Sequence, residues 1–289
     1  MKGGLGNQLF AYAAARRLSL VNGVELVLDN VSGFKRDALY GRSYELDQFS
    51  IPCRIATPWE RMEPLERLRR GLSIKFSGRK PFSEREYISQ EGIDFDERLL
   101  YRKLSGRTYI DGLWQGSDYF ADIEETIRTD LRPRQKLSQE SQSLMEQIIS
   151  SASPVALHLR DFDTSNHTPI YNLGSDYYER AVLAILSAAP AAHFFVFAEN
   201  ASLLSKVGFL ESKQVTIVGN GTRFRSAFED LMLMSTCHHF ITANSTFSWW
   251  GAWLGTNPSK VITTPASTIS GSITAWNFPG LIPDTWMLV

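Results

Sequence analysis

The chain has 289 residues and a formal net charge of −1, and 43% of its residues are hydrophobic. Because nucleic-acid-binding proteins usually carry a clear basic excess, this balance argues against a nucleic-acid partner. The hydrophobic content is ordinary for a globular protein, and at roughly 100–200 residues per domain the length predicts two domains. We place the first domain at residues 1–140 and the second at residues 150–289.

The two cysteines, Cys53 and Cys237, are far apart in the sequence and form no C-x-x-C pair. The sequence therefore predicts neither a disulfide framework nor a structural zinc site, and it favours a reducing compartment. No signal peptide opens the chain, and no apolar run reaches the roughly 18 residues that a membrane span needs. We expect a cytoplasmic protein.

A glycine-rich loop at residues 3–8 opens the chain, and a helical apolar pattern follows it until Gly23. Glycines let the backbone approach a ligand closely, and amide groups at a helix N-terminus favour an anion. A tight turn without a ligand is the alternative. Residues 24–28 then have the pattern of a short strand that ends at Asp29. A nicotinamide-dinucleotide fingerprint would need a third glycine where Leu9 stands.

A basic stretch follows within residues 30–105, a region whose weak periodicity predicts helices and long loops. Its bases between positions 61 and 80 include Arg67, Arg69, Arg70, Lys75, Arg79 and Lys80. Such a stretch fits a peripheral contact with the anionic inner membrane, or with an anionic acceptor. The glutamates at positions 60, 63 and 66 fit an ordinary solvated helix face instead.

Residues 109–112 have the pattern of a strand end that leads into Trp114 and Gln115, and residues 119–131 have a helical pattern. A tryptophan ring offers a flat apolar surface to a sugar, so Trp114 is a candidate for acceptor binding, with core packing as the alternative.

From Pro154 onward, apolar segments of strand length alternate with helical patterns. These segments are residues 155–159, 194–198, 215–218, 239–242 and 261–264. Asp176 and Glu179 have the spacing of a capping pair at the start of the clearest helix. The alternation predicts a C-terminal doubly wound parallel sheet. The chain is thus expected to be an α/β protein with two Rossmann-like domains that face a cleft, the GT-B-like arrangement.

Two chemically informative segments come after strands of this expected sheet. Arg160 follows the first strand, and an arginine there can grip a diphosphate bidentately and stabilise negative charge on it. An ion pair with Asp161 or Asp163 is the alternative, and His158 beside it fits a core histidine as well as a catalytic one. Glu199 follows the next strand, where it would hold guanine or ribose unless it forms a plain turn.

The second segment, residues 244–254, follows the strand at residues 239–242. Its hydroxyl and amide groups at a helix start can form a phosphate cradle. The alternative is a capped helix with an aromatic core stripe, for which Phe247, Trp250 and Leu254 have the spacing.

Together, residues 3–10, 111–120, 158–163 and 244–254 resemble successive motifs of the bacterial alpha-1,2-fucosyltransferase family, in the family's order. The resemblance extends to residues 282–286. It implies transfer of L-fucose from GDP-fucose to a galactoside hydroxyl in alpha-1,2 linkage, with inversion and without a divalent metal or other cofactor. It also implies a galactose-containing oligosaccharide or glycolipid acceptor, as in a lipopolysaccharide O-antigen.

The resemblance implies that Arg160 contacts the donor diphosphate. It implies further that Ser245, Thr246 and Phe247 lie near the phosphates and the nucleotide, and that Asn7 lies near the β-phosphate and the acceptor. The remaining candidates are Gly6, His158 and Glu199 for the donor and Trp114 and Gln115 for the acceptor. Asp163 is the candidate for the proton acceptor, and it would equally orient Arg160.

The chain departs from the family's pattern at two places. Asp161 and Phe162 stand where the family has an arginine and a glycine, and only Met1 and Lys2 precede the glycine loop, where the family has a β-strand. The altered motif keeps open a non-catalytic GDP-sugar-binding protein. Asp29, an acid at the end of the strand that follows the glycine loop, keeps open a nicotinamide-dependent oxidoreductase.

Overall fold

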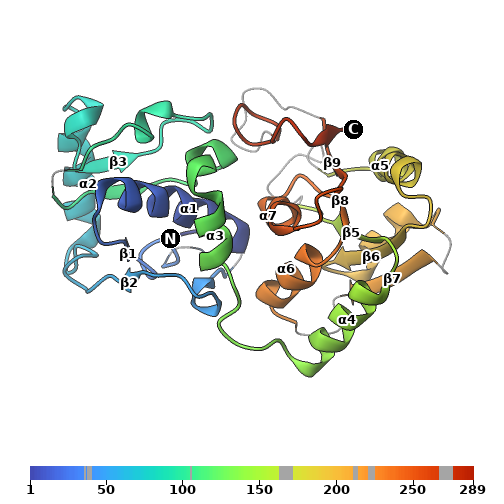
Figure 1. The fold of residues 1–289 in the computed structure, drawn as a ribbon. Helices are drawn as coiled ribbons and strands as arrows, with labels where there is room; N and C mark the ends of the chain where they lie inside the picture. Colours follow the sequence, from blue (N-terminus) through green and yellow to red (C-terminus); the bar gives the residue numbers. More distant parts are fainter. Residues whose placement is uncertain are drawn as a thin grey trace. The chain divides into compact units, whose positions relative to one another are not determined.

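The computed structural model divides the chain into two compact units (Figure 1). Unit 1 contains residues 1–134 and 278–282, and unit 2 contains residues 135–277 and 283–289. The structure describes residues 1–35, 37, 41–104, 106–162, 172–210, 214–220, 225–266 and 276–289, with the backbone alone at residues 219 and 220.

Unit 1 packs a long first helix beside two short pairs of parallel strands, β1–β2 and β3–β4. Its helices and strands are α1 (Leu5–Asn22), β1 (Val27–Leu28), β2 (Arg54–Ile55), α2 (Glu66–Ser77), β3 (Tyr87–Ser89), β4 (Tyr109–Asp111) and α3 (Glu124–Asp130). Gly23 ends α1 with φ +62°, as the sequence predicts. A cavity of about 260 Å³ is lined by residues of α1 and of both strand pairs, through β1 and β4.

The helical pattern at residues 119–131 is only partly a helix. Two short 3₁₀ turns, Ser117–Tyr119 and Ala121–Ile123, precede α3. Tyr119 and Phe120 are both buried, although the chain there does not continue as one helix. Apolar side chains recur toward the core without a continuous α-helix because tight turns also place every third or fourth residue on one side.

Unit 2 is an α/β unit with a six-stranded sheet in the order β10-β9-β8-β5-β6-β7, parallel throughout. Its elements are α4 (Gln139–Ser150), β5 (Pro154–Leu159), α5 (Ser175–Ala188), β6 (His193–Ala198), β7 (Val215–Asn220), α6 (Ala227–Ser235), β8 (His239–Ile241), α7 (Thr246–Leu254), β9 (Ile262–Thr264) and β10 (Met287–Leu288). Each of the five apolar segments forms one of these strands, which confirms the predicted parallel sheet.

The expected capping pair of α5 is wrong. Gly174 occupies the N-cap position and offers no side chain. Asp176 instead forms an ion pair with Arg180 one turn later, at 3.2 Å. Glu179 lies three positions after Asp176 and Arg180 lies four positions after it. Because these spacings differ by one residue, an acid at position 176 fits either a helix cap or a surface ion pair.

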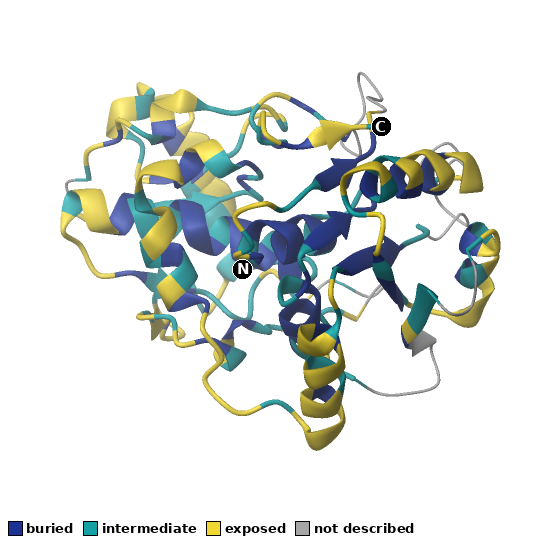
Figure 2. Ribbon diagram, turned by 45° about the vertical axis from the view of Figure 1, so that its right-hand side comes forward, coloured by how far each residue is buried: buried dark blue, intermediate teal, exposed yellow. Residues whose placement is uncertain are grey.

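Helices cover both faces of the six-stranded sheet (Figures 1 and 2). Val155, Leu157 and Leu159 of β5 pack toward α5 in one buried cluster with β6 and β8. The intervening residues of β5 point to the other face, where His158 meets α7. β5 is buried along its whole length, so the centre of the sheet is the rigid part on which the neighbouring loops are built.

Both cysteines are free thiols in the structure. None of the described helices combines the length and the apolar character needed to cross a lipid bilayer.

Candidate active site

The strand order of unit 2 creates a topological switch point beside β5. From β5 the chain proceeds to β6 and β7 on one side, and it returns to place β8, β9 and β10 on the other. Loops after the two strands at such a point diverge to opposite faces and leave a crevice for a ligand. Leu157 pairs with Ile241 across the two strands, so Arg160 and Asn244 each follow their paired residue by three positions.

Contact between His158 and Phe247 joins the end of β5 to the start of α7. Their ring centroids are 5.6 Å apart. Burial, with a contribution from the Arg160 charge, lowers the pKa of His158 to about 3. The imidazole is therefore neutral near pH 7, and its Nδ1 has no hydrogen-bond partner within the described ranges. His158 cannot serve as a cation for a phosphate in this state.

Arg160 supplies the positive charge at the same edge. It forms an ion pair with Glu199, which follows β6, and its side chain is 17% exposed. Asp161, the acid that replaces the family's second arginine, pairs instead with Lys206 of the 3₁₀ segment Ala201–Val207. The Lys206 ammonium also donates a hydrogen bond to the Leu173 carbonyl, at 2.7 Å. Lys206 thus compensates the charge of Asp161.

The start of α7 offers polar groups to the same crevice. Ser245 is the N-cap residue, and its hydroxyl accepts a hydrogen bond from the Phe247 amide at 3.3 Å. The first turn carries no acidic side chain. Because helix N-terminal amides bear a partial positive charge, this end of α7 favours an anionic ligand.

The rest of α7 belongs to the core. Residues 244–247 are partly exposed, whereas Trp249, Trp250 and Trp253 are buried against one another. The helix that Phe247, Trp250 and Leu254 were predicted to continue is α7, and its aromatic core stripe consists of the three tryptophans. The division between a polar helix start and an aromatic core stripe is confirmed.

Two tyrosines that the sequence analysis did not assign to the site brace the switch point. The Tyr177 hydroxyl donates a hydrogen bond to the Thr242 carbonyl at 2.5 Å, and the Tyr178 hydroxyl donates one to the His158 carbonyl at 3.3 Å. Both tyrosines are buried in α5. They hold the ends of β8 and β5 from the opposite face. Two adjacent tyrosines on an otherwise aliphatic helix face were the available signal.

In unit 1 the glycine loop brings Asn7 and Gln115 together. The Gln115 side-chain amide donates a hydrogen bond to Asn7 Oδ1 at 2.8 Å. Gly3 has φ +74°, and a Cβ there would lie 2.8 Å from Asn7 Nδ2, so glycine lets the loop close over Asn7. Gln8 is fully buried and donates to the carbonyls of Gly3 and Ser43. Gln8 therefore supports the loop and is not directed at a ligand.

Trp114 is only 1% exposed and meets Tyr119 edge-on, with ring centroids 5.7 Å apart. This position favours core packing over an open sugar platform, and the role of Trp114 in acceptor binding stays a prediction.

Gly6 is buried in the first turn of α1. Asp163, the candidate proton acceptor, lies outside the described residues. No group of three histidine, cysteine, aspartate or glutamate side chains suited to a metal occurs within the described ranges, and metal independence stays a prediction.

The sequence profile of "Glycosyl transferase family 11" matches residues 52–272, which is more than half of the chain. The chain belongs to glycosyl transferase family 11. This match confirms the resemblance to the alpha-1,2-fucosyltransferases and identifies the protein as a glycosyltransferase. The segments that meet at the switch point, after β5 and after β8, both lie within the matched residues.

Among its relatives is the O-antigen biosynthesis glycosyltransferase WbnK of Escherichia coli, 30% identical over 311 aligned positions that cover 99% of this chain and 98% of WbnK. An alpha-1,2-colitosyltransferase of Escherichia coli is 27% identical, with 88% of this chain and 86% of that protein covered. The structure of the alpha-1,6-fucosyltransferase NodZ soaked with GDP-fucose has a TM-score of 0.51 at 17% identity, with 88% of this chain and 90% of NodZ covered. That likeness shows the shared fold.

The buried imidazole should make this family 11 enzyme sensitive to acid. His158 has a folded-state pKa of about 3, below its usual value of 6.5, so the unfolded state binds the extra proton as the pH falls below 6.5. Its contribution to the free energy of unfolding should fall by about 2–3 kcal/mol between pH 6.5 and pH 4.5. Denaturant unfolding at both pH values checks this. His158→Gln, which cannot titrate, should show a correspondingly smaller loss, and an equal loss in both proteins would contradict it.

Proposed function

We propose that this glycosyltransferase transfers L-fucose from GDP-fucose to a galactoside hydroxyl in alpha-1,2 linkage, by a single inverting displacement without a divalent metal. One observation carries the proposal. At the switch point of unit 2, the end of β5, which Arg160 follows, meets the start of α7, which Ser245 caps. A donor diphosphate needs a cation and hydrogen-bond donors, and both kinds of group lie at this edge. The similarity to WbnK and to the fucosyltransferase NodZ supports the choice of a sugar nucleotide.

In the proposed reaction, an acceptor oxygen forms a bond to the anomeric carbon while the bond from that carbon to the β-phosphate oxygen breaks. The electron pair of the broken bond leaves with GDP, so negative charge grows on the diphosphate. Arg160 and the amides of α7 stabilise that charge, as a fixed cation and fixed dipoles do without reorganisation. This arrangement supplies the charge compensation that a metal ion supplies elsewhere.

The acceptor proton goes to a carboxylate, for which Asp163 is the proposed residue. Neutral His158, with its pKa lowered to about 3, is a poor base at pH 7. We assign His158 instead to donor binding through its buried Nδ1. Glu199 leaves Arg160 when the diphosphate binds, and it then becomes available to a ribose hydroxyl. Asn7, held by Gln115, is proposed to contact the donor phosphate and the acceptor.

The decisive experiment measures GDP and GDP-fucose binding by calorimetry in EDTA, followed by transfer to a panel of beta-galactosides. We expect GDP and GDP-fucose to bind in the presence of EDTA. We also expect NMR to show that the sugar is attached to one acceptor hydroxyl with inverted configuration. Activity that disappears in EDTA and returns with Mn²⁺ would contradict metal independence. Nucleotide binding without transfer to any galactoside would favour a non-catalytic protein or another acceptor class.

A colitosyl group is the second candidate for the transferred sugar, because an alpha-1,2-colitosyltransferase is 27% identical over most of both chains. The same transfer assay with the corresponding colitosyl nucleotide separates the two. A higher kcat/KM for the fucosyl donor supports the proposal, and a higher kcat/KM for the colitosyl donor overturns the choice of sugar. The role of Arg160 is the same in either case because it addresses the diphosphate.

A further inference from the structure

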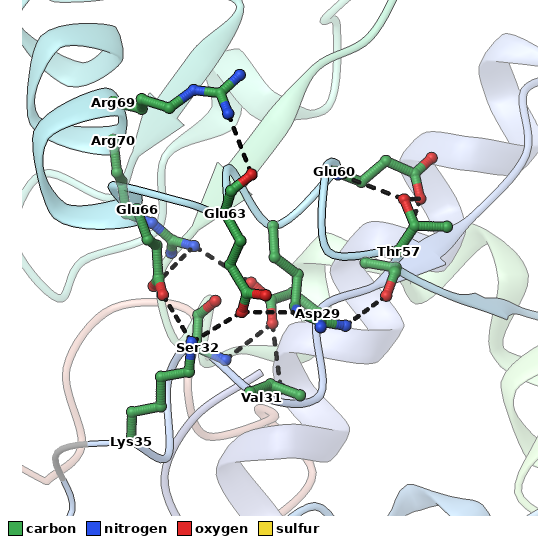
Figure 3. A network of polar contacts seen from close by, with 12 residues as sticks. Asp29, Val31, Ser32, Lys35, Thr57, Glu60, Glu63, Glu66, Arg69 and Arg70 are labelled. Carbon is green, nitrogen blue, oxygen red and sulfur yellow. Dashed lines mark hydrogen bonds and ion pairs between the residues drawn. The ribbon is translucent and has the colours of Figure 1, made fainter.

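Helix α2 in unit 1 turns its polar face toward the protein (Figure 3). Glu66 forms an ion pair with Lys35 at 3.0 Å, and Arg70 forms one with Asp29 at 3.2 Å. Ser77, the only buried residue of the helix, accepts a hydrogen bond from the Tyr87 amide at 3.0 Å. These inward residues recur at helical spacing, so ionic and hydrogen-bonded contacts attach α2 to the unit, in contrast to the apolar face of an ordinary surface helix.

The apolar side chains of α2 face outward. Leu65, Leu68, Leu72 and Phe76 follow one another at intervals of three or four residues and are 69%, 59%, 44% and 57% exposed. We call these four residues the apolar stripe. Trp59, 61% exposed, lies in the loop that precedes the helix. Single exposed apolar residues are common, but a continuous stripe on one helix indicates a surface that is covered by a partner.

Positive charge accompanies the apolar stripe. Residues 59–80 contain seven arginines and lysines and three glutamates, although the whole chain has a net charge of −1. The glutamates are engaged by bases of unit 1: Glu60 pairs with Arg54 at 2.8 Å, and Lys35 contacts the other two. Arg67, Lys75 and Arg79 are exposed, and none forms an ion pair within the part of the chain that the structure describes.

A groove of about 400 Å³ adjoins the apolar stripe. Leu72, Phe76 and Trp59 give it apolar walls and Arg107 adds a basic group, whereas Lys80 is paired there with Glu86 at 3.1 Å. The Arg69 guanidinium lies over the Trp59 ring, 4.3 Å from its centroid. Apolar walls with basic groups beside them match a molecule that has a hydrocarbon chain and an anionic head.

We propose that α2, with Trp59, is a membrane-binding helix that lies in the interface of an anionic lipid bilayer. In that position the apolar stripe enters the acyl boundary while Arg67, Lys75 and Arg79 remain at the level of the lipid phosphates. Amphipathic helices with basic polar faces bind membranes in this way, and each base near an anionic surface strengthens the attraction. A lipid surface fits better than a protein because hydrocarbon next to phosphate matches the apolar stripe together with the exposed bases Arg67, Lys75 and Arg79.

Vesicle flotation tests the proposal with the intact chain. Vesicles of phosphatidylcholine with 30% phosphatidylglycerol are compared with phosphatidylcholine alone, at about 0.1 M salt where charges act over roughly 10 Å. The apolar variant replaces Leu68, Leu72 and Phe76 with serine, and the charge variant replaces Arg67, Lys75 and Arg79 with glutamine. The matched control carries Ile149→Ser and Leu183→Ser, which are 65% and 64% exposed on helices of unit 2.

We expect the wild-type chain and the control to float with anionic vesicles, and both α2 variants to lose binding by about tenfold or more. Tryptophan emission should shift to the blue on binding in the wild-type chain and not in Trp59→Ala. Unchanged thermal unfolding of each variant shows that the loss is local. Absence of wild-type flotation, or equal loss in the control, overturns the proposal. It is also overturned if the stripe drives self-association without lipid, seen by sedimentation velocity and abolished in the apolar variant.

Discussion

Arg160→Ala is expected to lower kcat/KM for sugar transfer by roughly 10²–10³-fold, because a fixed cation aimed at the leaving diphosphate is worth that much in the transition state. Affinity for GDP should fall by about 10- to 100-fold, the value of one or more hydrogen bonds to a charged group. Calorimetry with GDP and initial-rate kinetics measure the two effects. A loss in kcat/KM that exceeds the loss in GDP affinity would locate the additional interaction in the transition state.

Arg180→Ala is the matched control for this prediction. Arg180 is an arginine of the same unit, 56% exposed, with a single ion pair to Asp176 on its own helix. Exposed pairs of this kind contribute at most about 1 kcal/mol to stability, so neither folding nor binding should change measurably. Arg160→Lys should give an intermediate loss because lysine keeps the charge and loses the two-pronged geometry. Full activity in Arg160→Ala would remove the diphosphate role.

The sheet of unit 2 could be predicted because its strands are parallel and buried. A strand that is covered on both faces has to be apolar along its length, and residues 155–159 and 194–198 are such runs. In unit 1 the same criterion locates β1, within residues 24–28, but misses β2. β2 consists of Arg54 and Ile55, both exposed, and no apolar run marks it. Strands of two or three residues are held by their neighbours, which sequence periodicity does not reveal.

The orientation of helix α2 was not predicted from the sequence, for a related reason. Its inward face is polar, so the rule that apolar residues point to the core gives the wrong orientation. The ion pairs that attach it to the unit join residues as far apart as Asp29 and Arg70. The basic stretch itself was recognised, and the structure adds the exposed apolar stripe beside it.

The candidate site was predicted residue by residue but not as an arrangement. Arg160 and Ser245 were chosen because each follows an apolar strand. Their proximity depends on the pairing of β5 with β8, which skips two intervening strands in the sequence. The pairing of Asp161 with Lys206 joins residues 45 positions apart, and only the fold brings them together. Long-range ion pairs and strand order are tertiary properties that local patterns do not encode.

Trp250→Ala is expected to destabilise unit 2 by about 3–5 kcal/mol, because removal of a fully buried indole leaves a cavity that the neighbours fill only partly. Trp250 is 0% exposed, with the rings of Trp249 and Trp253 at centroid distances of 5.2 and 5.1 Å. The melting temperature of unit 2 should fall by roughly 10 °C, as differential scanning calorimetry would measure. Trp59→Ala is the matched control, since that ring is 61% exposed and should contribute less than about 1 kcal/mol.

This substitution also tests how the helix core supports the proposed donor site. α7 begins at the switch point and continues as the tryptophan stripe, so the stripe fixes where the Ser245 cap lies. A ligand that binds only the folded state raises the melting temperature in proportion to its affinity. GDP should therefore stabilise Trp250→Ala less than the wild-type chain, because a displaced helix start binds phosphate more weakly. An equal shift in both proteins would mean that the cap keeps its position without the stripe, and that β8 alone positions it.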